Sequence, residues 1–223
     1  MVENVFEAPL LKVQRATKFR DELQTELDRY SSTSPCSGRM VKIGEDYKIQ
    51  INWKGISLVP GAIFGDAIHN LRAALDLASN ILVKSLGKNP RDVYFPFSTK
   101  KLNFEERLRI SNFNKADIGA IEVVRKYRPY KDGNTILWSI NYFDIRDKHQ
   151  SLVPTSHSMQ ICATGSYDID NPLAGSVQVS TDNIFYRFPE NIIFEGEDII
   201  QKLDEMIAEV KNILSDLTEF VKI

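Results

Sequence analysis

The stretch from Gly61 to Ser85 constrains the fold more than any other part of the sequence. Its apolar residues recur at alternating steps of three and four: Ile68, Leu71, Leu75, Ala78 and Leu82. Residues with this spacing lie on one stripe of an α-helix, because the helix turns once in about 3.6 residues. We therefore expect an amphipathic helix over residues 61–86, with this stripe facing a core.

A second stripe on the same predicted helix is polar. His69, Arg72 and Asp76 follow one another at steps of three and four, beside the apolar stripe. An imidazole, a guanidinium and a carboxylate in this arrangement can hydrogen-bond to one another or to a partner. The stripe predicts either a structural network or a site.

The rest of the chain divides into helical and extended segments. Four more segments have a helical apolar period, and they predict helices at 9–30, 114–127, 134–149 and 197–222. Asn114 is the expected N-cap of the helix at 114–127, and either Asn134 or Thr135 is the expected N-cap of the helix at 134–149. Residues 40–56 and 158–188 alternate apolar with polar side chains, as strands of one antiparallel sheet would, and Thr181–Asn183 resembles a hairpin turn.

These elements predict an α+β fold in a single domain over residues 1–223: a helical bundle of about five main helices with a mostly antiparallel β-sheet elaboration. A length of 223 residues with 43% hydrophobic residues is sufficient for such a core. The aromatic segment YFPFS at 94–98 is expected to form a packed loop. The inner face of the fourth helix is expected to contain Ile136, Ile140 and Phe143, with Leu137 and Trp138 as two further candidates.

Charge and cysteine content narrow the class of protein. With 28 basic and 30 acidic residues the net charge is -2, which gives no general reason to expect a polyanion or a membrane as partner. Residues 100–131 are locally basic, and we interpret them as a solvated face more readily than as a nucleic-acid surface. Two distant cysteines and the absence of a long apolar run favour a cytoplasmic protein without a membrane segment.

The segment FDIRDKHQ at the end of the fourth predicted helix holds a second polar group. Asp144, Asp147, Lys148 and His149 lie within six residues of one another, so they are expected to meet His69, Arg72 and Asp76 across a helix contact. A carboxylate would then orient a histidine for general acid–base chemistry. We prefer a structural network, since ion pairs between helices often specify packing alone.

Several well-known site motifs are absent from the sequence. It has no phosphate-binding loop, no dinucleotide fingerprint, no nucleophile elbow and no HExxH. Three histidines without metal-ligand spacing predict neither a metal nor another cofactor.

Four motifs of the sequence match a known pattern: GDAIHNLRAALDLASNIL, YFPFS, RPY and LWSINYFDIRDKHQSLVP. They resemble the motifs HNLRxALDxL, FPF, QPY and DKHR of a family of uncharacterised bacterial and phage proteins. The resemblance covers residues 59–154. It implies a phage or mobile-element type of protein but carries no assigned activity.

The helices with a polar, histidine-containing end also resemble, more distantly, the HEPN superfamily of helical bundles. Many members are dimeric proteins that bind or cleave RNA, so the resemblance implies a homodimer with an RNA or protein partner. Arg146 lies three residues before His149, closer than the Arg–His spacing of the HEPN ribonucleases. Asp144, Lys148 and His149 would therefore form a variant site.

We expect a helical-bundle binding protein that acts through an RNA or protein partner. One alternative is a metal-independent ribonuclease, with His149 as general acid or base and Arg72 or Lys148 stabilising the charge on the phosphate. Another is a small-molecule sensor with a pocket between bundle and sheet.

Overall fold

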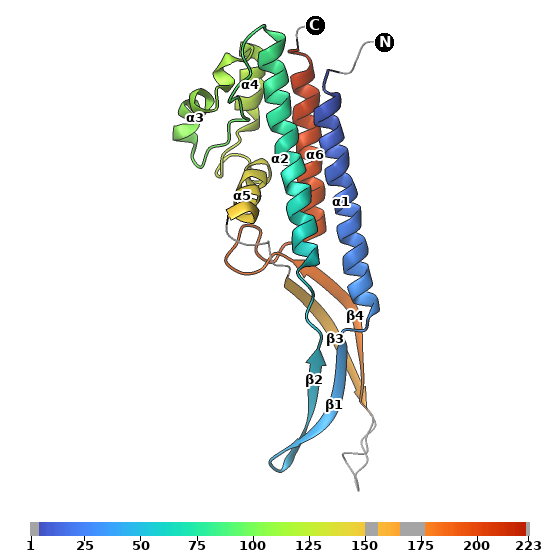
Figure 1. The fold of residues 1–223 in the computed structure, drawn as a ribbon. Coiled ribbons are helices and arrows are strands. Elements are labelled where there is room, and N and C mark those ends of the chain that lie inside the picture. Colours follow the sequence, from blue (N-terminus) through green and yellow to red (C-terminus); the bar gives the residue numbers. More distant parts are fainter. Residues whose placement is uncertain (1–4, 150–155, 166–176, 222–223) are drawn as a thin grey trace. The chain divides into compact units, whose positions relative to one another are not determined.

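The computed structural model describes residues 5–149, 156–165 and 177–221, and at 149, 156–165 and 177–183 it describes the backbone alone. Within these ranges the chain forms six α-helices and four β-strands (Figure 1), which confirms the α+β class. The chain divides into two compact units. The helical unit contains α3 to α5, α1 up to Leu23, α2 from Gly61 and α6 from Ile200, and the sheet unit contains α1 from Gln24 and all four strands. The single domain stays a prediction.

Five of the six helices in the described residues correspond to the five predicted main helices, with shifts at their ends, and the short α3 is additional. The six helices are α1 (Glu7–Ser32), α2 (Val59–Ser85), α3 (Phe104–Ile110), α4 (Ile118–Tyr127), α5 (Thr135–His149) and α6 (Ile199–Thr218). Figure 1 shows α1, α2 and α6 as long helices with nearly parallel axes. An ion pair from Arg20 on α1 to Asp204 on α6, 2.8 Å from Nε to Oδ1, links two of them within the helical unit.

The core of the helical unit follows the apolar stripes of the sequence. All five stripe residues of α2 are fully buried, as are the corresponding residues of α6: Leu203, Met206, Val210, Ile213 and Leu217. Burial of a leucine or isoleucine side chain contributes roughly 1.5–3 kcal/mol, so these stripes supply much of the stability of the unit. The apolar period therefore identified the core correctly.

The two expected helix caps have different outcomes. Of the two candidates for the cap of α5, Asn134 takes the role, since its Oδ1 accepts the N–H of Leu137 at 3.0 Å. Asn114 does not cap α4, because it lies in a short 3-10 turn, Phe113–Lys115. Asp117 takes that role, and its carboxylate accepts the N–H of Gly119 at 2.9 Å. An aspartate also suits the positive end of the helix dipole.

The sheet unit contains two separate two-stranded antiparallel sheets where we expected one. They are β1 (Cys36–Ile43) with β2 (Asp46–Trp53), and β3 (Ser156–Gly165) with β4 (Val177–Arg187). Each strand pairs with its neighbour in the sequence, because local hairpin pairing needs no long loop closure. Gly44 adopts a φ of +65° in the two-residue turn between β1 and β2, a conformation that glycine favours.

The predicted turn at Thr181–Asn183 is wrong. Strand β4 continues through these residues, and its register with β3 shifts at this point. Gln160 pairs with Asn183 and Ile161 pairs with Thr181, which leaves Asp182 as the extra residue of a β-bulge. A bulge accommodates a turn-forming residue without ending the strand, and this explains why the sequence at Asp182 resembles a turn.

The segment YFPFS forms a packed loop, as expected. Phe95 and Phe97 are buried, whereas Tyr94 is 50% exposed. The N–H of Tyr94 donates to the carbonyl of Ser111 at 3.0 Å, and the N–H of Ser98 donates to the carbonyl of Pro129 at 3.0 Å. These bonds hold the loop against the segments that flank α3 and α4. In the part of the chain that the structure describes, no helix is both long enough and apolar enough to span a membrane.

Candidate functional site

The polar residues of α2 and α5 meet across the helix contact, as the sequence predicts. Asp144 is the centre of this contact, at 5% exposure. Its Oδ1 lies 3.1 Å from Nδ1 of His69, and its Oδ2 accepts a hydrogen bond from Nζ of Lys148 at 2.8 Å. Arg72 donates from a terminal nitrogen to the side-chain oxygen of Asn141. The two helices are thus joined by polar contacts on one side.

Asp76 extends this network to the aromatic loop. Its Oδ2 accepts from Nε of Arg72 at 3.1 Å, and its Oδ1 accepts from the backbone N–H of Phe95 at 2.8 Å. Burial raises the pKa of the Asp76 carboxyl, and Arg72 and the Phe95 N–H lower it in part. The Asp76 carboxylate therefore links Arg72 to the aromatic loop. These two donors offset only part of the cost of burying its negative charge.

An open cavity of about 410 Å³ lies over this network, and we name it the polar cavity. The side chain of His69 is 52% exposed. The lining residues are His69, Arg72, Ala73, Asp76, Leu77, Asn80, Tyr94, Asp144 and Lys148. Five of the seven residues that we predicted from the sequence, on α2 and α5, therefore converge at a surface that solvent reaches.

Asp147 and His149 have other positions. Asp147 lies against Gly65 of α2, so close that a Cβ at position 65 would be 2.5 Å from its Oδ1. That Oδ1 is buried, and no hydrogen-bond partner for it exists among the described residues. His149 is the last residue of α5, and its side chain lies outside the described part of the chain. The proposed catalytic role of His149 stays a prediction.

The charge of Asp147 is unfavourable where it lies. Burial raises the pKa of its carboxyl first, and repulsion by Asp66 and Asp144 raises it further, while His69 and Lys148 lower it. A carboxyl with a raised pKa in the folded state binds its proton more tightly there than in the unfolded chain. Its contribution to stability is therefore present at low pH and is lost as the pH rises through the folded pKa.

We expect Asp147→Asn to raise the free energy of unfolding at pH 7 by about 0.5 kcal/mol, a small value because the side chain is partly exposed. The amide has the same size and carries no charge. The gain should shrink as the pH falls and vanish near the pKa of an unfolded aspartate, about 3.9. Urea unfolding at several pH values measures it, and a gain that grows toward low pH would contradict the sign.

A second cavity, of about 510 Å³, shares Arg72 with the polar cavity, and we name it the aromatic cavity. Arginine and aromatic side chains dominate its lining. The lining residues are Arg72, Tyr94, Phe95, Pro96, Phe97, Ser98, Thr99, Arg107, Ile110, Ser111, Trp138, Asn141, Tyr142, Ile145 and Arg146. Because Arg72 and Tyr94 line both cavities, the two form adjoining parts of one face of the helical unit.

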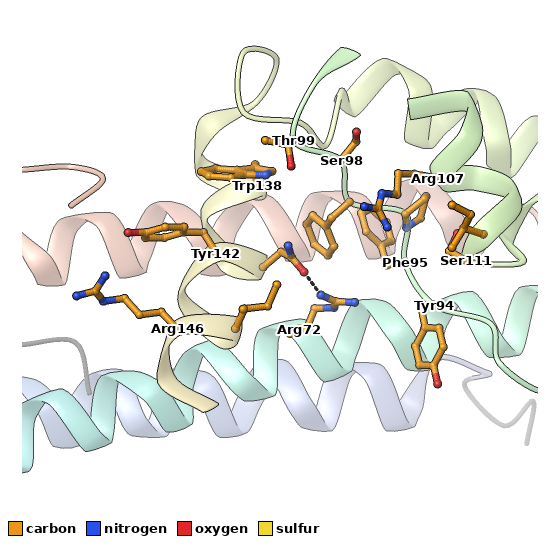
Figure 2. Close-up of a pocket in the computed structure, with 15 residues that line it drawn as sticks. Arg72, Tyr94, Phe95, Ser98, Thr99, Arg107, Ser111, Trp138, Tyr142 and Arg146 are labelled. Atoms are coloured by element: carbon orange, nitrogen blue, oxygen red, sulfur yellow. Dashed lines mark hydrogen bonds between the residues drawn. The ribbon is translucent and has the colours of Figure 1, made fainter. Parts of the chain in front are cut away.

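One row of side chains on α5 forms a wall of the aromatic cavity. Trp138, Tyr142 and Arg146 follow one another at steps of four and project from the same side of the helix (Figure 2). The rings of Trp138 and Tyr142 stack at 5.5 Å with an interplanar angle of 28°. Nζ of Lys131 lies 5.9 Å from the Trp138 ring centre. The row offers aromatic surface with cationic groups at both ends.

Of the two further candidates for the inner face of α5, Trp138 does not face the core. It is half-buried at the cavity wall, and its neighbour Leu137 is the fully buried residue. A helix of 3.6 residues per turn places adjacent residues about 100° apart, and on α5 this step puts Leu137 in the core and Trp138 at the edge of the buried face. The four-residue spacing of Trp138, Tyr142 and Arg146 was the signal in the sequence that could have identified this surface.

The arginines of the aromatic cavity differ in their partners. Arg72 is engaged by Asp76 and Asn141, and its guanidinium lies 4.7 Å from the Phe97 ring centre. Arg107 comes from α3 with its guanidinium directed toward the cavity (Figure 2). No acidic side chain of the described residues pairs with Arg107, and Nε of Arg146 is buried without an acceptor among them. Both arginines line the aromatic cavity.

Neither similarity to known proteins nor a metal site in the described residues identifies the function of the two cavities. Comparison with models of protein families, with curated proteins and with solved structures finds no match. Among the described residues, no cluster of three or more histidine, cysteine or carboxylate side chains could hold a metal ion. The site is therefore interpreted from its own geometry.

Proposed function

We propose that this chain is a HEPN-like helical-bundle protein that binds single-stranded RNA through the aromatic cavity. The observation that carries the proposal is the stacked pair Trp138–Tyr142 with Arg107 and Arg146 near it, neither of them paired with a described carboxylate. Aromatic faces and free guanidinium groups are the two components that a site for single strands combines.

Each component matches one part of a nucleotide. Stacking of a base on an aromatic side chain contributes about 1–3 kcal/mol and tolerates any base. A guanidinium binds two phosphate oxygens at once, which makes arginine the preferred residue for a sugar–phosphate backbone. The bases of a duplex are already stacked on one another, so a single strand fits better.

The size of the cavity supports a short contact within a longer strand. A volume of about 510 Å³ lies in the usual range of ligand pockets, roughly 300–1,000 Å³. The strand would continue over the polar cavity, which shares Arg72 and Tyr94. The proposal retains the homodimer and the RNA partner that the HEPN resemblance implies.

Two arginines of α3 allow a matched test. Arg107 and Arg109 are both exposed, but only Arg107 lines the cavity. We expect Arg107→Gln to weaken binding of a fluorescein-labelled single-stranded RNA about tenfold, and Arg109→Gln to change it less than about twofold, since tenfold corresponds to about 1.4 kcal/mol for one lost phosphate contact.

Fluorescence anisotropy at several salt concentrations measures both variants. Loss of one phosphate contact should also reduce the slope of log K against log salt by about 0.7 for a single strand. Equal weakening in the two variants would mean that RNA meets only a diffuse positive surface, and this result would contradict the proposed site.

A further inference from the structure

We propose that the aromatic cavity prefers guanine to adenine, and that Asn141 is the residue that determines this specificity. This inference rests on the proposed function, because a base must first stack in the cavity. Stacking alone tolerates any base, so a preference requires hydrogen bonds to the edge of the base.

The side chain of Asn141 has a fixed orientation. Nη1 of Arg72 donates a hydrogen bond to Oδ1 of Asn141, which the dashed line in Figure 2 marks. A guanidinium has donors only, so the asparagine must direct its oxygen toward Arg72. Asn141 lines the aromatic cavity, and the part of its side chain that can still contact a ligand there is the NH₂ group.

Arg72 is itself held in place beside Asn141. Its Nε donates to Oδ2 of Asp76 at 3.1 Å, and its guanidinium lies 4.7 Å from the ring centre of Phe97. These contacts leave other N–H groups of the guanidinium, and Arg72 lines the same cavity. The hydrogen-bonded Arg72–Asn141 pair therefore offers neighbouring N–H donors whose positions are set before a ligand arrives.

Asn141 lies beside the stacked rings on α5. It follows Trp138 by three residues and precedes Tyr142 by one, and all three residues line the cavity. The two rings stack at 5.5 Å. A base that stacks on this aromatic surface can thus direct one edge toward the amide of Asn141 and the guanidinium of Arg72.

The other polar groups of the cavity also favour acceptors on the ligand. Arg107 and Arg146 add two more guanidinium groups, and none of the described residues in the lining is an aspartate or a glutamate. Hydroxyl groups in the lining, such as that of Ser111, can donate or accept and therefore discriminate less. A base edge that carries acceptors matches this surface, whereas an exocyclic amino group would direct its donors at other donors.

Guanine is the purine with such an edge. Its O6 and N7 are neighbouring acceptors, and adenine has the N6 amino donor in the place of O6. An asparagine with both side-chain groups available usually binds adenine, because it accepts from N6 and donates to N7. In this chain Arg72 occupies the oxygen of Asn141, so the amide can only donate. Both purines offer similar stacking surface, and this edge therefore decides between them.

The test is fluorescence anisotropy with the purified chain and four labelled single-stranded RNAs that differ at one position. Each RNA is a short strand of uridines with guanosine, adenosine, inosine or 2-aminopurine at its centre. We expect the guanosine strand to bind about tenfold more tightly than the adenosine strand. Inosine keeps O6 and N7 and should bind like guanosine, whereas 2-aminopurine lacks O6 and should bind like adenosine.

Asn141→Asp tests the assignment to Asn141. Its carboxylate can still pair with Arg72, but it offers the ligand an oxygen acceptor in place of the N–H donors. The preference for guanosine should disappear or reverse toward adenosine. Asn141→Leu, which has neither donor nor acceptor, should reduce the ratio of the two affinities to about one. Because each variant is compared with itself on two strands, a general loss of RNA affinity cancels from the ratio.

Arg107→Gln is the matched control, because Arg107 is assigned to the phosphates. It should weaken binding of the guanosine and adenosine strands equally and leave their ratio unchanged. Equal affinity of the wild-type chain for these two strands would overturn this inference and leave the proposed function intact. A preference that persists in Asn141→Asp, or that Arg107→Gln abolishes, would overturn the role of Asn141. Absence of RNA binding would overturn both proposals.

Discussion

Replacing Phe143 by alanine is expected to lower the free energy of unfolding by about 4 kcal/mol, within the range for a fully buried phenylalanine. Phe143 is 1% exposed, and its ring packs edge-on against Phe64 of α2 at 5.3 Å. It also contacts the ring of Tyr142 at 5.1 Å. The truncation removes the apolar anchor that holds α5 against α2, and it leaves a cavity between them.

Urea unfolding followed by circular dichroism measures this loss. Leu102→Ala is the matched control, because Leu102 is 90% exposed and its truncation should change the stability by less than about 0.5 kcal/mol. The Phe143 variant should also bind RNA less well, since Tyr142 follows the position of the helix. A loss below about 1 kcal/mol would show that α5 is not held by this packing.

Asp76→Ala is expected to lower the free energy of unfolding by about 3 kcal/mol. The change leaves the N–H of Phe95 without its acceptor and leaves Arg72 without its carboxylate partner. A buried hydrogen-bond donor without an acceptor costs about 1–3 kcal/mol of stability, and more if the donor is charged. The loop that carries Phe95 also lines the aromatic cavity, so the variant should lose RNA affinity together with stability.

The control is Asp76→Asn, which keeps an oxygen acceptor but not the charge. Because burial raises the pKa of the Asp76 carboxyl, its negative charge is costly in the folded state. We expect the asparagine variant to stay within about 1 kcal/mol of wild type. Equal losses of stability in Asp76→Ala and Asp76→Asn would contradict the conclusion that Asp76 stabilises the fold mainly by accepting the hydrogen bond from the N–H of Phe95.

The convergence of α2 and α5 could be predicted because it depends on periodic spacing. The steps of three and four in the α2 stripe put His69, Arg72 and Asp76 on one side of a helix whose neighbouring side is apolar. Asp144 and Lys148 are one turn apart on α5. When two helices bury their apolar stripes against each other, the polar rows beside those stripes also meet. The sequence therefore predicted the contact between these polar residues that the structure shows.

The aromatic cavity could not be predicted in the same way. Its lining combines α2, the loop at 94–99, α3 and α5, and no local pattern reports that these segments meet. The local patterns predicted other positions. They placed Trp138 among the candidates for the core and the basic stretch that contains Arg107 on a solvated face. Tertiary packing decided both, because Leu137 occupies the core position beside Trp138 and α3 turns Arg107 toward the cavity.

The sheet unit shows the same limit of local patterns. The alternation of apolar and polar residues predicted the strands. It did not predict that β1 pairs with β2 and β3 pairs with β4 in two separate sheets, because strand pairing is a property of the folded unit. The bulge at Asp182 depends on the partner strand, so a single-strand pattern cannot distinguish it from a turn.

If single-stranded RNA occupies the aromatic cavity, it contacts Trp138, and the fluorescence of this residue reports the contact. The chain has two tryptophans, and Trp53 is an exposed residue of the sheet unit, so Trp53→Phe leaves Trp138 as the only reporter. We predict saturable quenching of Trp138 as RNA is added, with a midpoint that shifts about tenfold in Arg107→Gln and is unchanged in Arg109→Gln. RNA binding detected by anisotropy without any change in Trp138 fluorescence would show that RNA does not occupy the aromatic cavity.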